Sequence, residues 1–402
     1  MPTTIGSRPW RRGWRPCMPK SALPTVHGVT YNCPVVAAPR VAVNASIIGP
    51  RSSGLGEHAR GLVRALDALH APLVIHTALP AAVSPLRAAV RRAPAFVVPE
   101  RGLRGHLARL MWAQVALGRH VARDGVDVLV NTIPEGPLVS SVPQVTVVHD
   151  VIPLDFPGDY PRQQLYFRRL VPAVLRRARM VVAVSEATRR RVIDAYGLSP
   201  ARVRTVLNGF DVERFSPEGP AFGDGALPYV LFVGNLLPHK NLPRLVQAFA
   251  AAAASSPARL VVVGGGRPRA VAQLRALAER AGATVEIRSF VPPPELAPLL
   301  RGARALVLPS LAEGFGLPAV EAMACGTPVI VSNVSALPEV VGDAALLVDP
   351  LDVTALGEAI ARVLSDDRLR KELSARGLER AARFSWSRCA AELLTVVREV
   401  AG

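Results

Sequence analysis

Short apolar runs rich in β-branched residues alternate with Ala-, Leu- and Arg-rich segments along most of this 402-residue chain. The runs YVLFV (229–233) and RLVVV (259–263) lack the alternation of polar and apolar residues that a strand with one face in water would show. Continuous apolar strands that alternate with helices are typical of parallel sheets covered by helices on both faces. The sequence therefore predicts an α/β fold of the doubly wound, Rossmann-like kind.

The alternation occurs in two successive blocks, which predicts two such domains facing each other across a cleft. A single hydrophobic core rarely grows beyond about 250–300 residues, so two domains also suit the length of the chain. The expected strands are 40–47, 127–131, 144–149, 180–184, 203–206, 229–233, 259–263, 284–288, 305–308 and 328–331. The expected helices are 56–69, 104–123, 161–178, 186–196, 242–254, 268–281, 293–301, 317–324 and 354–364.

Changes in composition predict the domain boundaries. Residues 1–39 carry five basic side chains, no acidic one and no apolar core of a signal peptide, and we expect a poorly ordered extension. The first domain is expected at 40–214 and the second at 229–382. The segment 215–228, rich in Pro, Gly and acidic residues, is the expected linker. Residues 383–402 are expected to form a C-terminal helix that packs back on the first domain.

Cysteine usage and hydropathy indicate the compartment. The four cysteines, Cys17, Cys33, Cys325 and Cys389, show neither metal-ligand nor disulfide spacing, which fits a reducing cytoplasm. No apolar run approaches the roughly 20 residues of a membrane-spanning helix. We therefore expect a cytoplasmic protein.

The formal net charge of +17 raises the question of an anionic partner. The basic residues are mostly Arg, are scattered, and are not interleaved with aromatic residues, so nucleic-acid binding is not predicted. Nine arginines between Arg162 and Arg191 alternate with apolar residues and indicate amphipathic helices with a basic face. Such a face could rest on an anionic membrane surface, although an ordinary solvated helix shows the same pattern.

Residues suited to a ligand site follow several expected strands. Gly54 and Gly56 come after the first strand and would let backbone amides at a helix start approach an anion, although a tight turn without a ligand explains them equally well. His149 and Asp150 end the strand QVTVVH. Lys240 is one of three lysines and precedes Asn241, a good helix N-cap. Because ligands bind at the carboxyl ends of parallel strands, these positions favour a site in the cleft.

The stretch EGFGLPAVEAMACG places Glu313 and Glu321 eight residues apart around a turn. Pro318 is suited to the first turn of a helix, so Glu313 is expected in a loop and Glu321 in the helix. Even in a continuous helix the two would be about 80° apart, which disfavours a shared acid–base pair or joint metal ligation. Two separate hydrogen-bonding roles, with a phosphate on the helix amides between them, describe a nucleotide sugar.

From about Val41 to Phe384 the chain resembles family 4 of the retaining GT-B glycosyltransferases. EGFGLPAVEAMACGTPV resembles the E-x7-E signature of the family. GLGEHARGL, VVHDVIPLDFP, AVSEATRR, LNGFDVERFSP, GNLLPHKN and VVVGGG resemble its other motifs in the same order. The resemblance implies that the first domain binds the acceptor and the second binds the nucleotide sugar.

The resemblance also implies roles for individual residues. Lys240 would bind the donor diphosphate, Glu313 the sugar hydroxyls and Glu321 the ribose. His149 would lie against the sugar, and Gly54 and Gly56 near the diphosphate. Gly264 and Asn235 would lie at donor-domain strand ends, and Phe290 and Val291 beside the base. The backbone of Gly314, Phe315, Gly316 and Leu317 would run along the sugar and the phosphate. The family usually carries Arg where this chain has Asn235 or His239. A second diphosphate cation would have to come from elsewhere, such as Arg267 or Arg244.

The family mechanism implied is front-face transfer with retention, in which the leaving diphosphate assists deprotonation of the acceptor. It needs no enzyme nucleophile, no cofactor and no catalytic metal. The H-D and P-x-K-N variants resemble transferases that build O-antigens, exopolysaccharides and glycolipids. The favoured donor is GDP-mannose, with UDP- or dTDP-linked hexoses as alternatives. The acceptor would be a glycan, a lipid-linked glycan or a glycolipid, with the protein peripheral on the inner face of the membrane.

Three other functions are compatible with parts of the sequence. Nucleotide-sugar epimerases share the fold but not the E-G-F-G-L-P-x-x-E string. The net charge taken alone would suggest a basic protein that binds nucleic acid or a membrane. An inactive homologue would be consistent with Asn235 in place of Arg.

Overall fold

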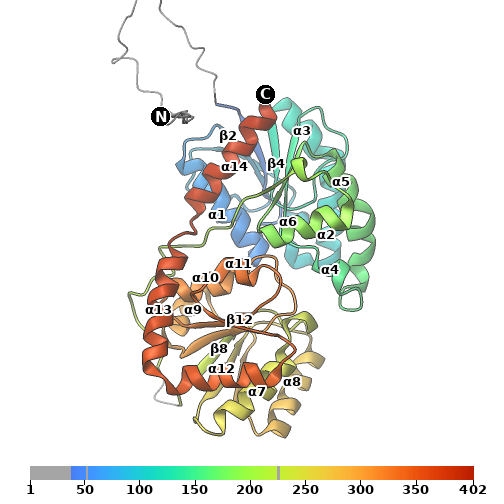
Figure 1. Ribbon diagram of the computed structural model, residues 1–402. Coiled ribbons are helices and arrows are strands. Elements are labelled where there is room, and N and C mark those ends of the chain that lie inside the picture. The colour runs from blue at the N-terminus through green and yellow to red at the C-terminus, as the bar shows by residue number, and fades with distance from the viewer. Residues whose placement is uncertain (1–37, 51–52, 224–226) are drawn as a thin grey trace, which may run out of the picture. The chain divides into compact units, whose positions relative to one another are not determined.

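A computed structural model describes residues 38–50, 53–223 and 227–402 of the chain. The expected extension 1–39 therefore lies, up to residue 37, outside the described residues, as do three residues of the expected linker. The described part contains two sheets in which every strand pair is parallel, with helices on their faces (Figure 1). The predicted α/β class with two Rossmann-like parallel sheets is confirmed.

The first sheet has the strand order β3-β2-β1-β4-β5-β6-β7. Its strands are β1 (Val41–Asn44), β2 (Leu73–Thr77), β3 (Ala89–Arg92), β4 (Val128–Asn131), β5 (Gln144–Val148), β6 (Met180–Ala183) and β7 (Val203–Thr205). The strand order reverses between β1 and β4, and ligands of doubly wound sheets bind at such a switch point. Both neighbours of β1 are in register with it: Asn44 at its carboxyl end pairs with His76 and Asn131.

Helices and helical turns connect these strands. The α-helices are α1 (Gly54–Ala68), α2 (Gly102–Trp112), α3 (Gly118–Arg123), α4 (Ile152–Asp155), α5 (Val171–Arg177) and α6 (Glu186–Tyr196). The π-helical segments η4 (Ala113–Leu117) and η6 (Tyr166–Leu170) interrupt what the sequence predicts as continuous helices at 104–123 and 161–178. Short 3₁₀ turns are η1 (Pro80–Ala82), η2 (Ala95–Val97), η3 (Pro99–Arg101), η5 (Pro161–Gln163) and η7 (Pro200–Arg202).

The second sheet has the order β10-β9-β8-β11-β12-β13, with its switch point between β8 and β11. Its strands are β8 (Tyr229–Val233), β9 (Arg259–Val263), β10 (Val285–Arg288), β11 (Ala305–Leu308), β12 (Val329–Ser332) and β13 (Leu346–Val348). Its helices are η8 (Pro238–Lys240), α7 (Leu242–Ala253), α8 (Pro268–Ala281), α9 (Pro293–Gly302), α10 (Leu317–Ala324), α11 (Leu337–Val341), α12 (Val353–Ser365) and α13 (Asp367–Ala381).

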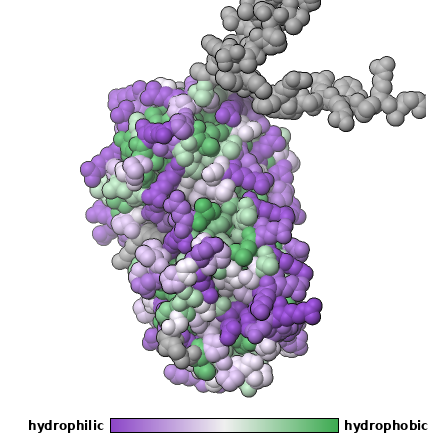
Figure 2. Space-filling view, turned by 90° about the vertical axis from the view of Figure 1, so that its left-hand side faces the viewer, coloured by the Kyte–Doolittle hydropathy of each residue, from purple (hydrophilic) through white to green (hydrophobic). Residues whose placement is uncertain are grey.

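The C-terminal helix α14 (Trp386–Ala401) returns to the first domain and lies along α1 (Figure 1). Ser385 caps it by accepting a hydrogen bond from the Arg388 amide. Its first residue, Trp386, fills the space beside Gly61 and Gly209, where a Cβ would come within 2.2 Å and 2.1 Å of Trp386 atoms. These two glycines allow the helix to approach closely. The face on the α13–α14 side is a mosaic of hydrophilic residues and small apolar patches (Figure 2).

Periodicity and strand composition missed several elements. β2 contains the buried polar residues His76 and Thr77, and β3 is an edge strand whose AVRR sequence is mostly exposed. β13 is a three-residue edge strand, and α13 has a largely charged surface. β2, β3 and α13 lack the continuous apolar run or wide apolar stripe on which the prediction depended, and β13 is shorter than the runs of about 4–8 residues that indicate a strand.

Candidate functional site

The loop before α10 separates the two glutamates. Gly316 adopts a left-handed φ of 94°, and Pro318 lies in the first turn of α10 as predicted. Glu313 lies in the loop and Glu321 in the helix. They have different neighbours, which fits two separate roles better than a shared acid–base pair. Phe315 is buried and packs against Phe384, so in this loop only its backbone is available to a ligand.

Lys240 and Glu313 meet in the second domain. The Lys240 Nζ donates to Glu313 Oε1 at 2.6 Å, and the hydroxyl of Ser310 donates to the same oxygen at 2.8 Å. Both charged side chains are largely buried, at 18% and 11% exposure. Lys240 comes from the turn after β8 and Glu313 from the loop after β11, so the two strands that flank the switch point supply the pair.

Asn241 does not cap α7, contrary to the prediction. Its backbone is left-handed, and its side-chain amide donates to the carbonyls of Pro309 and Pro350 at 3.0 and 2.7 Å. It thereby ties the lysine turn to the end of β11. The carbonyl oxygen of its side chain accepts from Arg244 at 2.9 Å. Arg244 is therefore already engaged in the second domain.

The positions around Lys240 show which group could supply a second cation. His239 is buried, and burial together with the neighbouring Lys240 charge lowers its pKa to about 4, so it is neutral at pH 7. Its Nδ1 lies 3.2 Å from the Tyr160 hydroxyl. Asn235 is exposed and lines a cavity of about 790 Å³ together with Arg267. Arg267 is also exposed, directly before α8.

Glu321 lies among charges contributed by the first domain. Burial raises its pKa to about 7, and the nearby carboxylates of Glu57 and Asp211 act in the same direction, whereas Arg214 opposes them. The Nε of Arg214 is buried without a hydrogen-bond partner among the described residues. The region around Glu321 therefore combines a carboxylate that titrates near neutrality with a buried guanidinium donor.

The Gly314 backbone touches the strand end of the first domain. A Cβ at Gly314 would lie 1.9 Å from the His149 carbonyl oxygen and 3.1 Å from the Asp150 Cβ. The Gly314 carbonyl accepts hydrogen bonds from the hydroxyls of Ser185, at 2.7 Å, and Thr188, at 3.1 Å. The two domains thus meet at the loop that carries Glu313.

The His149 side chain has a defined orientation. Its Nε2 lies 2.9 Å from the Thr132 carbonyl, so this nitrogen carries the proton and Nδ1 is left as an acceptor. Burial lowers its pKa to about 4, so the ring is neutral. The ring of His58 packs against it edge-on, with centroids 4.4 Å apart, and His58 Nδ1 bonds Asn208 Oδ1 at 2.9 Å.

The other predicted positions are distributed as follows. Helix α1 begins at Gly54, where a Cβ would be free, and the Gly56 amide is already bonded to Ser53 Oγ at 3.1 Å, so it is not a free anion-binding group. Gly264 has a φ of 147° and lies where a Cβ would be 1.9 Å from the Gly234 carbonyl, so packing alone requires glycine there. Phe290 is 67% exposed after β10, and Val291 is partly buried.

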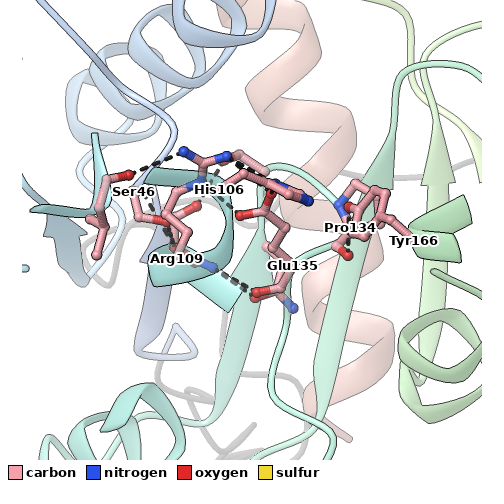
Figure 3. A network of polar contacts seen from close by, with 10 residues as sticks. Ser46, His106, Arg109, Pro134, Glu135 and Tyr166 are labelled. Atoms are coloured by element: carbon pink, nitrogen blue, oxygen red, sulfur yellow. Dashed lines mark hydrogen bonds and ion pairs between the residues drawn. The ribbon is translucent and has the colours of Figure 1, made fainter. Parts of the chain in front are cut away.

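Sequence reasoning missed a buried polar network in the first domain (Figure 3). Arg109 Nε and Nη2 donate to the two carboxylate oxygens of Glu135 at 2.8 and 3.2 Å, and His106 Nδ1 lies 3.0 Å from Glu135 Oε1. Tyr166 donates its hydroxyl to the Pro134 carbonyl at 3.1 Å. These residues line a cavity of about 470 Å³ that also reaches His149 and Asp150. They belong to separate, unremarkable sequence segments, so no local motif signals them.

Within residues 38–50, 53–223 and 227–402, no three His, Cys, Asp or Glu side chains cluster in a way that could hold a metal ion. In the same residues, no helix is both long and apolar enough to cross a membrane.

Comparison with known proteins identifies relatives of both domains. Residues 52–214 match the family "Glycosyltransferase Family 4", and residues 223–380 match "Glycosyl transferases group 1". The chain is 34% identical over 269 residues to the O-antigen chain mannosyltransferase B of Escherichia coli, covering 63% of this chain and 70% of that protein. It is 35% identical over 249 residues to a D-inositol 3-phosphate glycosyltransferase of Nocardioides, covering 56% and 54%. It therefore spans only part of the length of either relative.

Among solved structures, the sucrose-phosphate synthase of Thermosynechococcus elongatus superposes with a TM-score of 0.70 at 22% identity. The alignment covers 90% of this chain and 98% of that one. At this level of identity the likeness concerns the fold, and it extends across both domains.

Proposed function

The chain belongs to glycosyltransferase family 4 and has the GT-B fold, and from this premise we propose that it is a retaining enzyme that moves a hexose from a nucleotide sugar to a glycan or glycolipid acceptor of the cell envelope. The observation that carries the proposal is the pairing of Lys240 with Glu313 at the switch point of the second sheet, with Glu321 on the helix that follows. On this proposal Lys240, from the turn after β8, serves as the cation for the diphosphate. Glu313, from the loop after β11, serves the sugar hydroxyls, and Glu321, from α10, serves the ribose.

The proposed mechanism relies on stabilising the leaving diphosphate. Lys240 and the amides at the start of α10 would hold the phosphate oxygens, and Glu313 would accept hydrogen bonds from the sugar. His149, with Nδ1 as its free acceptor, would contact the sugar from the other domain. Arg267 would replace the family arginine absent at Asn235, since both line one cavity and His239 is neutral. No metal or cofactor takes part in this scheme, so turnover should survive a chelator.

We favour GDP-mannose as donor, with UDP- and dTDP-linked hexoses as alternatives. The support is the similarity to an O-antigen mannosyltransferase. The test is a screen of the full chain against GDP-, UDP- and dTDP-hexoses, with mass detection of slow hydrolysis and of transfer. Turnover of GDP-mannose above the other donors is the expected result. Failure of every nucleotide sugar to bind or react would refute the enzymatic proposal.

Membrane docking belongs to the same proposal, but we assign it to a different surface from the one expected. Arg189 and Arg191, within the predicted basic face, already bond Val203 O and Asp155. The exposed apolar stripe lies on α2 and η4, where Leu103, Leu107, Met111 and Val115 are each more than half exposed. Residues 101–123 contain no acidic residue and four exposed Arg, beside the buried Arg109. An apolar stripe with Arg beside it suits an anionic interface.

Liposome flotation tests this surface. We expect binding to vesicles with anionic lipid and loss of binding when Leu107 and Met111 are both replaced by Ser. Equal flotation with neutral and anionic vesicles, or none with either, would argue against docking on an anionic membrane surface.

A further inference from the structure

The cavity in the first domain, called here the acceptor cavity, lies next to the donor loop. It is formed where β1, β4 and β5 end, and its walls include Leu103 at the start of α2 and Phe167 on η6. At about 470 Å³ it falls within the ~300–1,000 Å³ range of small-molecule sites. Asp150 lines the cavity and lies against Gly314 of the donor loop. A molecule in this cavity would therefore be close to a sugar held at Glu313.

The deepest charges of the acceptor cavity neutralise each other. Arg109 and Glu135 are 5% and 3% exposed, and two hydrogen bonds join them. The remaining Arg109 Nη1 donates to the Val97 carbonyl at 3.1 Å. Burial alone would raise the pKa of Glu135, but the hydrogen bonds from His106 and Arg109 outweigh it and hold the pKa below its usual value. The Arg109 guanidinium is therefore committed to Glu135 and leaves little positive charge for a phosphate.

Asp150 has a different environment. Its Oδ1 accepts from the Ile152 amide at 3.1 Å, the one hydrogen bond that the described residues give its carboxylate. The second oxygen is thus left to accept from a ligand, and accepting is all that an ionised carboxylate can do. Burial raises its pKa to about 6, which still leaves it ionised at pH 7.5. His149 adds a second acceptor, its Nδ1. Both groups bind hydroxyl donors, and the carboxylate repels a phosphate.

We propose that the acceptor cavity receives an uncharged, hydroxyl-bearing sugar unit of the acceptor, and that Asp150 accepts a hydrogen bond from one of its hydroxyls and excludes phosphorylated acceptors. The apolar lining of Ile47, Ile133 and Phe167 gives a surface for the C–H face of a sugar ring. Arg162 also lines the cavity but is exposed. This inference rests on the proposed glycosyl transfer. It narrows the acceptor to uncharged sugars and excludes phosphorylated ones.

The test compares neutral and phosphorylated acceptors on the full chain. Octyl hexopyranosides, including octyl α-mannoside, are assayed beside hexose 6-phosphates and inositol 3-phosphate, with the reactive donor and mass detection of the product. The expected result is transfer to a neutral glycoside with a kcat/KM at least 10-fold above that of any phosphorylated acceptor. Preference for a phosphorylated acceptor in the unaltered protein would overturn the inference while leaving the transferase proposal intact.

Two variants separate a role of Asp150 in specificity from a role in folding. Asp150→Asn should raise the KM for the neutral glycoside at least 10-fold. The ratio of kcat/KM between neutral and phosphorylated acceptors should fall, and the affinity for a nucleoside diphosphate should stay within two-fold. Asp194→Asn, the same change at an exposed position on α6, is the matched control. An unchanged acceptor KM and preference in a folded Asp150→Asn protein would contradict the inference.

Should no donor react, the proposed function fails, but the acceptor cavity is still tested by saturation-transfer NMR. Octyl α-mannoside should bind to the unaltered chain and lose its signal in Asp150→Asn. Binding of inositol 3-phosphate in its place, or of neither compound, would overturn the inference independently of turnover.

Discussion

The Nζ of Lys240 lies 2.6 Å from Oε1 of Glu313, so the cation proposed for the diphosphate and the carboxylate proposed for the sugar form an ion pair with each other. Both are largely buried, and Ser310 adds a further hydrogen bond to the carboxylate. Each charge of the pair offsets the desolvation penalty that the other would have if it were buried alone. A donor that enters must offer each partner at least as good a contact.

The first prediction concerns the stability of this pair. Lys240→Met leaves the Glu313 carboxylate without its cation and should lower the free energy of unfolding by about 2 kcal/mol, less than for a fully buried pair because some solvent reaches it. Glu313→Gln should cost about 1 kcal/mol. The double variant should recover much of the Lys240→Met loss. Urea unfolding of all four proteins gives the coupling energy, and costs that simply add would show that the contact contributes nothing.

The second prediction separates the two glutamates. Glu321→Ala should weaken nucleoside diphosphate binding about 10-fold, the equivalent of roughly 1.4 kcal/mol, by removing an acceptor for ribose hydroxyls. Glu313→Ala should chiefly lower kcat. Calorimetry with the nucleotide, followed by steady-state kinetics, distinguishes these effects. Equal nucleotide affinity in Glu321→Ala and the unaltered chain would refute the ribose assignment.

The third prediction follows from the raised pKa of Glu321, about 7. Hydroxyl donors favour the ionised carboxylate, so donor binding should release a proton and strengthen with pH. With that pKa, the ionised fraction falls about 10-fold between pH 8 and pH 6, and nucleotide-sugar affinity should fall by about the same factor. The charges of Arg214, Glu57 and Asp211 also act on this pKa. All three are present both in the unaltered chain and in the Glu321→Gln variant. Glu321→Gln should show a flat profile, and the same slope in both proteins would assign the titration elsewhere.

The fourth prediction tests the replacement cation. Arg267→Ala should raise the donor KM about 10-fold, because Asn235 and the neutral His239 supply no charge. Asn235→Arg in that background should restore much of the loss. Arg275→Ala, at an exposed position of α8 outside this cavity, is the control for general charge loss. An unchanged donor KM in Arg267→Ala would place the second cation elsewhere.

Local sequence was sufficient for the parts of the fold and site that depend on local chemistry. Strands such as β8 and the proline-initiated α10 are determined by their own residues, so the two-sheet fold and the loop-then-helix placement of Glu313 and Glu321 could be predicted. The left-handed backbone of Asn241 could not be predicted. Its side chain bonds two carbonyls that only tertiary packing brings near, instead of capping α7 as its residue type favours. The Arg109–Glu135 pair joins residues 26 positions apart, and no spacing rule indicates it.

The last prediction concerns Gly314, where the domains meet. Its φ is not in the left-handed range, so an alanine there is not strained by its own backbone, but the Cβ would lie 1.9 Å from the His149 carbonyl. One domain must move away from the other, which also weakens the bonds from Ser185 and Thr188 to the Gly314 carbonyl.

Gly314→Ala should therefore lower kcat/KM at least 100-fold, because a shift of about 1 Å in substrate placement is enough for such a loss. Nucleotide affinity should stay within three-fold, since Lys240 and Glu321 both belong to the second domain. Gly223→Ala, where an added Cβ meets no atom within 4 Å, is the control and should behave like the unaltered chain. Unchanged turnover in a folded Gly314→Ala protein would mean that this contact plays no part in catalysis.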